Sequence, residues 1–159
     1  MISFPTTQIP ERGLHIEGDE PPDFLDLDRD PYARPAGPVH YDLSLSPAGS
    51  DLVLSGSLSA PFSLLCGRCA EFFSTFLRVS ASLHVYEWAK CPEILDVTPD
   101  VREDILLEIP GYPVCSADCK GLCPRCGTNL NRGTCSCSRA PDFPSPWSAL
   151  DALEKRQSQ

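Results

Sequence analysis

VHYDLSLSPAGSDLVLSGSLSAPFSLL, residues 39–65, decides the fold, because apolar residues alternate along it with small or polar ones. The apolar positions before the turn residues PAGS fall on one side of an extended chain: Val39, Tyr41, Leu43 and Leu45. Beyond the turn the same period runs through Leu52, Leu54, Gly56 and Leu58. A period of two is typical of half-buried β-strands. The stretch therefore predicts antiparallel strands joined by short turns.

The alternation returns after a CxxC motif, in FFSTFLRVSASLHVYEW, residues 72–88. It predicts a further strand whose apolar residues share one face: Val79, Ala81, Leu83 and Val85. In TPDVREDILLEI, residues 98–109, the spacing changes to that of a helix with one apolar stripe: Val101, Ile105 and Leu106. Thr98 is expected to cap this helix and Pro99 to occupy its first helical position.

The two ends of the chain are less regular. Residues 2–9 hold a short possible strand, and residues 17–38 are rich in proline, with seven carboxylates between Glu17 and Asp30. That composition predicts a solvated loop or linker. The other interpretation is an acidic docking segment with three apolar anchors, Phe24, Leu25 and Leu27. Near the C-terminus, a short helix is expected from Ser145 or Pro146, with Trp147, Leu150 and Leu153 on one side.

The expected fold class is α+β, with an antiparallel β-meander packed on one or two short helices and a C-terminal cysteine-rich zinc-binding knob. The expected divisions are a variable segment at 1–38, a core of sheet and helix at 39–112, a zinc-binding ribbon at 113–139, and a helix and tail at 140–159.

The knob is expected from CSADCKGLCPRCGTNLNRGTCSC, residues 115–137. CPRCG forms the tight turn that presents two sulfurs to one metal, and Gly127 permits the positive φ that closes it. With the later CSC pair, four cysteines close one site: Cys123, Cys126, Cys135 and Cys137. Two pairs remain, Cys66 with Cys69 and Cys115 with Cys119. Whether they form a second site depends on the fold, so the sequence leaves one or two zinc ions open.

Other uses of the thiols are less consistent with the sequence. Nine cysteines are an odd number, which suits a disulfide scaffold poorly. A redox CxxC is expected at a helix N-terminus after a strand, whereas here strands flank the motif. An iron–sulfur cluster also accepts four thiolates and stays open. Cys91 is expected to be a passive thiol.

Charge and composition exclude several classes of protein. The net charge of −9 excludes non-specific nucleic-acid binding over most of the surface. No apolar run is long enough for a transmembrane helix, and MISFPTTQIPERG is not a signal peptide, which favours the cytosol. The cysteine-rich segment is locally basic, through Lys120, Arg125, Arg132 and Arg139. These cations either offset thiolate charge or contact RNA phosphate or an acidic protein.

Three blocks resemble the YceD family, also called the large ribosomal RNA subunit accumulation proteins: LLCGRCAEFF, the segment from REDILLEIPGYPVC through DCKGLCPRCGTNLNRGTCSC, and PSPWSALDAL. The resemblance covers roughly residues 39–155, and its motif falls on all eight paired cysteines. It implies a cytoplasmic, non-enzymatic role in large-subunit ribosomal RNA accumulation and ribosome biogenesis. The expected partner is a large-subunit precursor, contacted through a basic ribosomal protein or ribosomal RNA, with no membrane and no small-molecule substrate. A thiol-based oxidoreductase or redox-sensing switch is the alternative.

Overall fold

The computed structural model describes residues 1–7 and 9–137. Along the chain lie β1 (Ser3–Pro5), β2 (Leu14–Glu20), the 3-10 helix η1 (Pro22–Leu25), β3 (Ala33–Pro35), β4 (Val39–Ala48), β5 (Asp51–Leu65), β6 (Phe72–Glu87), the 3-10 helix η2 (Trp88–Lys90), β7 (Ile94–Asp96) and α1 (Thr98–Leu107). The helix expected from residue 145 lies outside the described residues. Within the described part, no helix is long and apolar enough to cross a membrane.

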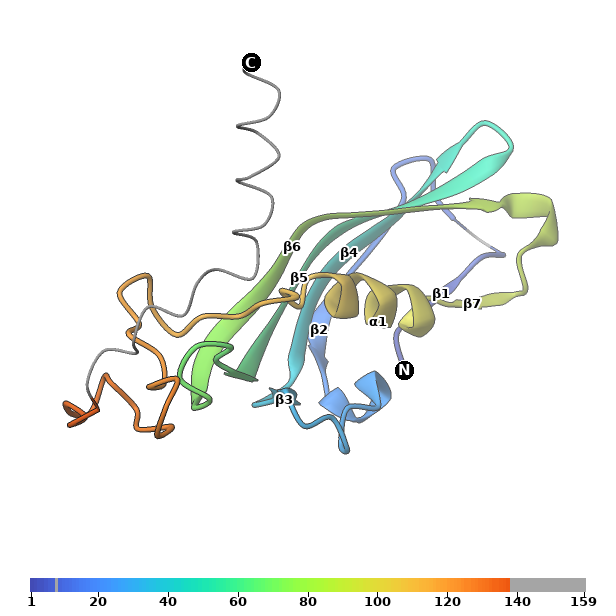
Figure 1. The fold of residues 1–159 in the computed structure, drawn as a ribbon. Coiled ribbons are helices and arrows are strands. Elements are labelled where there is room, and N and C mark those ends of the chain that lie inside the picture. Colours follow the sequence, from blue (N-terminus) through green and yellow to red (C-terminus); the bar gives the residue numbers. More distant parts are fainter. Residues whose placement is uncertain (8, 138–159) are drawn as a thin grey trace, which may run out of the picture.

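The main sheet is built around β5 and is antiparallel throughout (Figure 1). β4 pairs with β5 as far as Ser59, β3 pairs with it from Phe62, and β6 pairs along its other edge. β2 adds a strand beyond β4, and β1 pairs separately with β7. The consecutive pairing of β4, β5 and β6 confirms the predicted meander, and its long strands end at the cysteine-rich segment.

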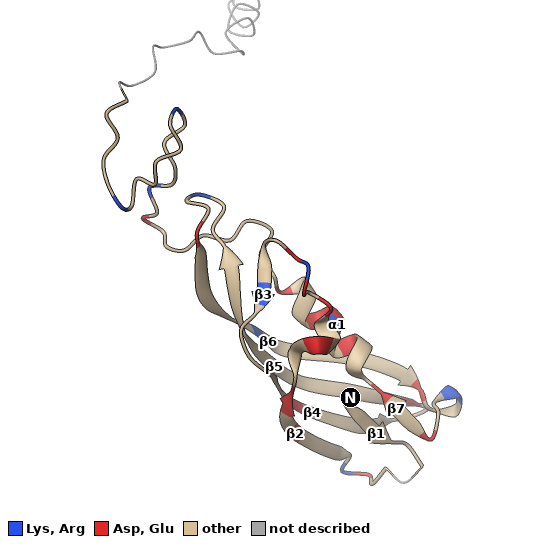
Figure 2. Ribbon diagram, turned by 90° about the horizontal axis from the view of Figure 1, so that it is seen from below, with Lys and Arg blue, Asp and Glu red and all other residues tan. Residues whose placement is uncertain are grey.

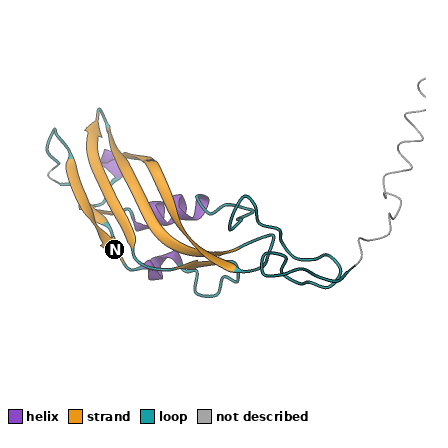
Figure 3. Cartoon of the chain, turned by 90° about the vertical axis from the view of Figure 1, so that its left-hand side faces the viewer, coloured by secondary structure: helices purple, strands orange, loops and turns teal. Residues whose placement is uncertain are grey.

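The core lies between one face of the sheet and two helical segments, η1 and α1 (Figure 3). Leu43, Leu54 and Phe62 point from the strands into it and are fully buried. Val101 and Ile105 meet them from α1, which confirms two residues of the predicted apolar stripe. The third, Leu106, is half-buried and is not part of the core. The expected α+β class is therefore observed, as an antiparallel sheet covered by one short α-helix.

The alternation in β6 changes phase at a bulge. Leu58 pairs with Val79 while Gly56 pairs with Ser82, so two residues of β6 oppose Ser57 alone. Val79 consequently packs against the core, whereas Leu83 is 65% exposed on the opposite face. The prediction that Val79, Ala81, Leu83 and Val85 share one face is wrong, because the extra residue inverts every position after it.

The acidic segment is structured, so the prediction of a solvated linker over residues 17–38 is wrong where strands form. Glu17 to Glu20 belong to β2 and pair with β4, and β3 pairs with β5. Leu25 is fully buried, and Phe24 and Leu27 pack against the same core. These three residues therefore anchor the segment to its own sheet.

The start of α1 differs from the expectation. Val97 is the N-cap and makes no side-chain capping bond. The Thr98 hydroxyl instead accepts a hydrogen bond from the Ile2 amide at 2.9 Å, which ties the N-terminal strand to the helix. Thr98 therefore takes the first helical position and Pro99 the second, one residue beyond the predicted place, where a proline still removes no helical hydrogen bond.

Gly56 marks a close approach of β4 and β5. A Cβ atom there would lie 2.0 Å from the carbonyl oxygen of Asp42 and 2.9 Å from the Cα of Leu43. Gly56→Ala is therefore expected to force the strands apart and to lower the free energy of unfolding by about 3 kcal/mol. Urea denaturation measures this, with Gly111→Ala as control, because nothing lies within 4 Å of that site. Equal unfolding midpoints for the two variants would contradict the expected clash.

Candidate metal centre

Eight cysteines gather into two groups of four, and within each group the sulfur atoms all lie within 4.8 Å of one another. The inner cluster consists of Cys66, Cys69, Cys115 and Cys119. The outer cluster consists of Cys123, Cys126, Cys135 and Cys137. Sequence spacing predicted the second grouping. The inner grouping depends on the fold, which brings the loop between β5 and β6 against residues 115–119.

The inner cluster lies where β5 turns into β6. The Cys66 amide donates to the Glu71 carbonyl at 2.9 Å, and the Ala70 amide donates back to the Cys66 carbonyl at 2.9 Å. This tight loop presents the first two thiols. The segment carrying the other two is attached by backbone hydrogen bonds, from the Gly67 amide to the Pro113 carbonyl at 2.8 Å and from the Leu122 amide to the Arg68 carbonyl at 3.0 Å.

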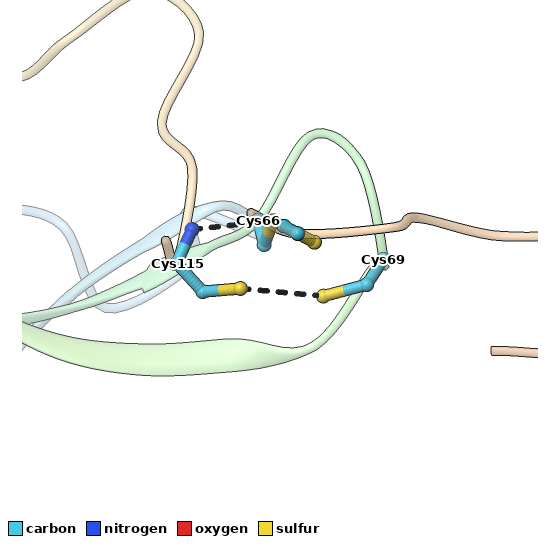
Figure 4. A group of neighbouring side chains, drawn as sticks. Cys66, Cys69 and Cys115 are labelled. Atoms are coloured by element: carbon cyan, nitrogen blue, oxygen red, sulfur yellow. Dashed lines mark hydrogen bonds between the residues drawn. The ribbon is translucent and has the colours of Figure 1, made fainter. Parts of the chain in front are cut away.

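The sulfur separations fit a tetrahedral metal site. Cys66 Sγ lies 3.9 Å from Cys119 Sγ. Cys69 Sγ lies 3.8 Å from Cys115 Sγ (Figure 4). Four sulfurs placed about 2.3 Å from one central ion are about 3.8 Å apart. A disulfide requires about 2.05 Å, so these contacts are not disulfides. The four-thiol donor set therefore fits a tetrahedral ion.

Backbone amides favour the ionised form of Cys66, whereas burial opposes ionisation of Cys69. Burial alone would raise the pKa of Cys66, but amide hydrogen bonds from Cys69, Cys115 and Arg68 lower it to about 6. Burial raises the pKa of Cys69 to about 12, with thiol contacts to Cys66 and Cys119 adding to the effect. Four thiolates this close repel one another, and a bound cation removes that cost by holding them deprotonated.

The outer cluster is built on the predicted turn. The Gly127 amide donates to the Cys123 carbonyl at 2.9 Å, and Gly127 has φ of +71°, which confirms its expected role. A side-chain hydrogen bond with Thr128, at 3.1 Å, and its backbone amide lower the pKa of Cys126 to about 6. The pKa of Cys137 rises to about 12, through its thiol contact with Cys126 and then through burial.

Asn131 joins the two clusters, a role that the sequence analysis did not predict. Its amide nitrogen donates to Cys119 Sγ at 3.3 Å, and its amide oxygen accepts from the Lys120 backbone at 2.8 Å. The Leu130 amide donates to the Gly121 carbonyl at 2.9 Å beside it. Asn131, which belongs to the segment between the two cysteine pairs of the outer cluster, thus supports Cys119 of the inner cluster. Spacing alone gave no indication of this contact.

Two arginines brace the same region. Arg68 donates from Nη1 to the carbonyls of Ala117, at 3.0 Å, and Cys119, at 3.4 Å. Arg132 forms an ion pair with Glu71 at 2.8 Å, between the ribbon and the start of β6. Arg132 thus has a carboxylate as its partner, whereas Arg139 lies outside the described residues. The sequence provided no reason to single out Arg68, because only the fold brings it to the backbone carbonyls of Ala117 and Cys119.

The positions of the two CxxC motifs and of Cys91 bear on the alternative that the thiols act in redox chemistry. Both CxxC motifs lie in turns, and the first joins two strands and does not open a helix, which is where a redox CxxC is usually activated. Cys91 lies apart from both clusters and donates to the Glu87 carbonyl at 3.5 Å. Burial raises the pKa of the Cys91 thiol, which disfavours the reactive thiolate.

Known proteins are similar to part of the chain, and the family model matches its C-terminal part. Residues 87–154 match the family model described as Large ribosomal RNA subunit accumulation protein YceD. An uncharacterised protein of Mycobacterium leprae is 28% identical over 107 residues, covering 58% of this chain and 49% of that protein. Large ribosomal RNA subunit accumulation protein YCED homolog 1, chloroplastic, of Arabidopsis thaliana is 40% identical over 50 residues, or 30% of this chain and 16% of that protein. Its Zea mays namesake is 47% identical over 47 residues, with the same coverages of 30% and 16%.

The chain spans about half the length of the mycobacterial protein and less of the plant proteins. No solved structure matches it. The segment matched by the family model holds six of the eight clustered cysteines and begins after Cys66 and Cys69. The inner cluster therefore joins the family segment to the hairpin that precedes it. The match of residues 87–154 to the family model, together with the likeness to two plant proteins of that name, supports membership of the chain in the YceD family.

Proposed function

We propose that the chain is a non-catalytic zinc-binding factor that supports the accumulation of large-subunit ribosomal RNA, and hence ribosome biogenesis, in the cytoplasm. The observation that carries this proposal is the pair of four-thiol clusters in a chain whose C-terminal part matches the YceD family model. Four protein ligands are the number that closes a structural zinc site and leaves no position for substrate. We expect two zinc ions per chain and no reaction at either one.

Zinc would supply the folding energy of the ribbon. Between Cys115 and Cys137 the large apolar side chains are Leu122 and Leu130, and the first is 38% exposed. Within the described residues, no helix and no named strand follows α1. Metal binding by such small thiol sites contributes on the order of 10 kcal/mol. The ribbon's role is then to hold a fixed surface beside the sheet, since the inner cluster attaches it to the β5–β6 loop.

The charge distribution supports a basic ribosomal protein as one contact within a large-subunit precursor. Acidic residues gather along η1 and α1, on the helical side of the sheet (Figure 2). The exposed ones include Asp23, Asp26, Asp28, Glu103 and Glu108. Opposite charge steers association and fixes orientation more than it adds affinity. The acidic side therefore suits a basic protein, and contact with ribosomal RNA requires a different surface.

Deleting the gene in its host is expected to lower mature large-subunit ribosomal RNA relative to small-subunit RNA, because precursors would lack this factor during assembly. Gel quantification of both RNAs measures the ratio. The wild-type gene should restore it, whereas Cys69→Ser, which lacks one ligand of the inner cluster, should not. An unchanged ratio in the deletion strain would reject the proposed function.

A further inference from the structure

The face of the sheet opposite η1 and α1 is not covered by any element of the described chain (Figure 3). Near the metal clusters it carries side chains of β3, β5 and β6. We call this surface the outer face; it consists of Arg34, Ser59, Pro61, Ser63, Phe72, Ser74, Phe76 and Arg78. Strand register places Ser63 between Arg34 and Ser74, and Pro61 beside Phe76. The residues thus form one continuous surface.

Two phenylalanines on this face are exposed to solvent, Phe72 at 40% and Phe76 at 63%. They are four residues apart on β6, and therefore about 13 Å apart on the same side of the strand. The Arg34 guanidinium lies 4.3 Å from the centroid of the Phe72 ring, and that of Arg78 lies 6.0 Å from the Phe76 ring. Aromatic rings interleaved with arginines are the composition on which single-stranded nucleic acids stack.

The outer face also differs in charge from the rest of the molecule. It carries two arginines and no carboxylate, although the whole chain has a net charge of −9. The acidic residues of η1 and α1 lie on the opposite side of the sheet (Figure 2). Glu17, Asp19 and Asp42 share the uncovered side but lie on β2 and β4, beyond the residues of the outer face. The outer face is therefore the part of this side that repels a polyanion least. The other residues of the face are serines and a proline, which leave the rings unobstructed.

We infer that the outer face binds single-stranded RNA, with Phe76 stacking on a base and with Arg34 and Arg78 contacting phosphates. Phe72 positions Arg34 through their cation–π contact. Duplex RNA offers no unstacked base and is expected to bind more weakly. The inference deepens the proposed function and rests on it for the choice of RNA as the polyanion. Phe72 and Phe76 escaped the sequence analysis because only the register brings arginines from two strands beside them.

Fluorescence anisotropy tests this with the full zinc-loaded chain and a labelled single-stranded RNA of about twelve nucleotides and mixed sequence. Phe76→Ala is expected to weaken binding roughly tenfold, the scale of one lost stacked base. Leu83→Ala is the matched control, because Leu83 lies on the same strand and the same side of the sheet and is 65% exposed, but lies beyond the residues that define the outer face. Arg78→Gln should reduce the slope of log affinity against log salt by about 0.7. Arg29→Gln, in the acidic segment, should leave that slope unchanged.

Three results would overturn the inference: wild-type affinity in Phe76→Ala, equal loss in Leu83→Ala, or equal binding of a duplex of the same sequence. Sedimentation tests a different occupant, a second copy of this chain. If the protein is a dimer that Phe76→Ala dissociates without changing RNA affinity, the outer face is an interface between copies. Complementation separates this inference from the proposed function. If deletion lowers large-subunit RNA and Phe76→Ala restores it fully, the outer face is not the RNA site, while the proposed function stands.

Discussion

Replacing Cys69 with serine is expected to lower the zinc content from two ions to one and to destabilise the sheet. Cys69 is 3% exposed, and a serine hydroxyl is a poor substitute in a set of soft thiolate ligands. Phe73 packs against both the inner cluster and the main core, so the damage extends into β6. We expect the free energy of unfolding to fall by roughly 3 kcal/mol, from the unpartnered buried hydroxyl and the lost metal together.

Urea denaturation and elemental analysis of the same samples measure both effects. Cys91→Ser is the matched control, because Cys91 is a partly buried cysteine outside both clusters. It should keep two zinc ions and lose little stability. If Cys69→Ser keeps the wild-type zinc content, the inner cluster is not a metal site.

Replacing Cys126 with serine is expected to remove one zinc ion while leaving the sheet intact. Cys126 is exposed, so little burial energy is lost and the effect comes from the metal. Without this zinc ion, little else stabilises the turns of the ribbon, because the ribbon makes few apolar contacts. The amides of Cys123 and Leu130, which donate to Thr128 and Gly121, should exchange with solvent many times faster.

Hydrogen exchange of the whole chain provides the comparison, because amides of β5 and β6 should keep their wild-type protection in Cys126→Ser. The opposite pattern is expected for Cys69→Ser, in which strand amides near the β5–β6 loop lose protection. Uniform acceleration in both variants would mean that the clusters do not act as separate structural units.

The sequence predicted those parts of the fold that depend on local pattern. The alternation from Val39 to Leu58 predicted two strands because every inward position except Gly56 is large and apolar. The helical spacing of Val101 and Ile105 was equally clear. β2 was missed because its outward face carries His15, Glu17 and Asp19, as an edge strand often does, and these charges hid the inward Leu14 and Ile16. The bulge in β6 was missed because Ser80, Ala81 and Ser82 are all small.

The same distinction between local pattern and tertiary arrangement applies to the two cysteine clusters. The outer cluster lies within one short segment, so spacing alone predicted its four ligands. The inner cluster joins residues 46 and 53 positions apart, and only the pairing of β5 with β6 brings those thiols together. The contacts of Arg68 and Asn131 around it follow from that tertiary arrangement. Single-residue patterns carry no information about such contacts.

Anomalous scattering at the zinc edge, from crystals of the protein purified without added metal, tests the central claim most directly. The account predicts two peaks per chain, one at the centre of the four sulfurs of each cluster. A single peak, no peak, or scattering at the iron edge in place of zinc would contradict it.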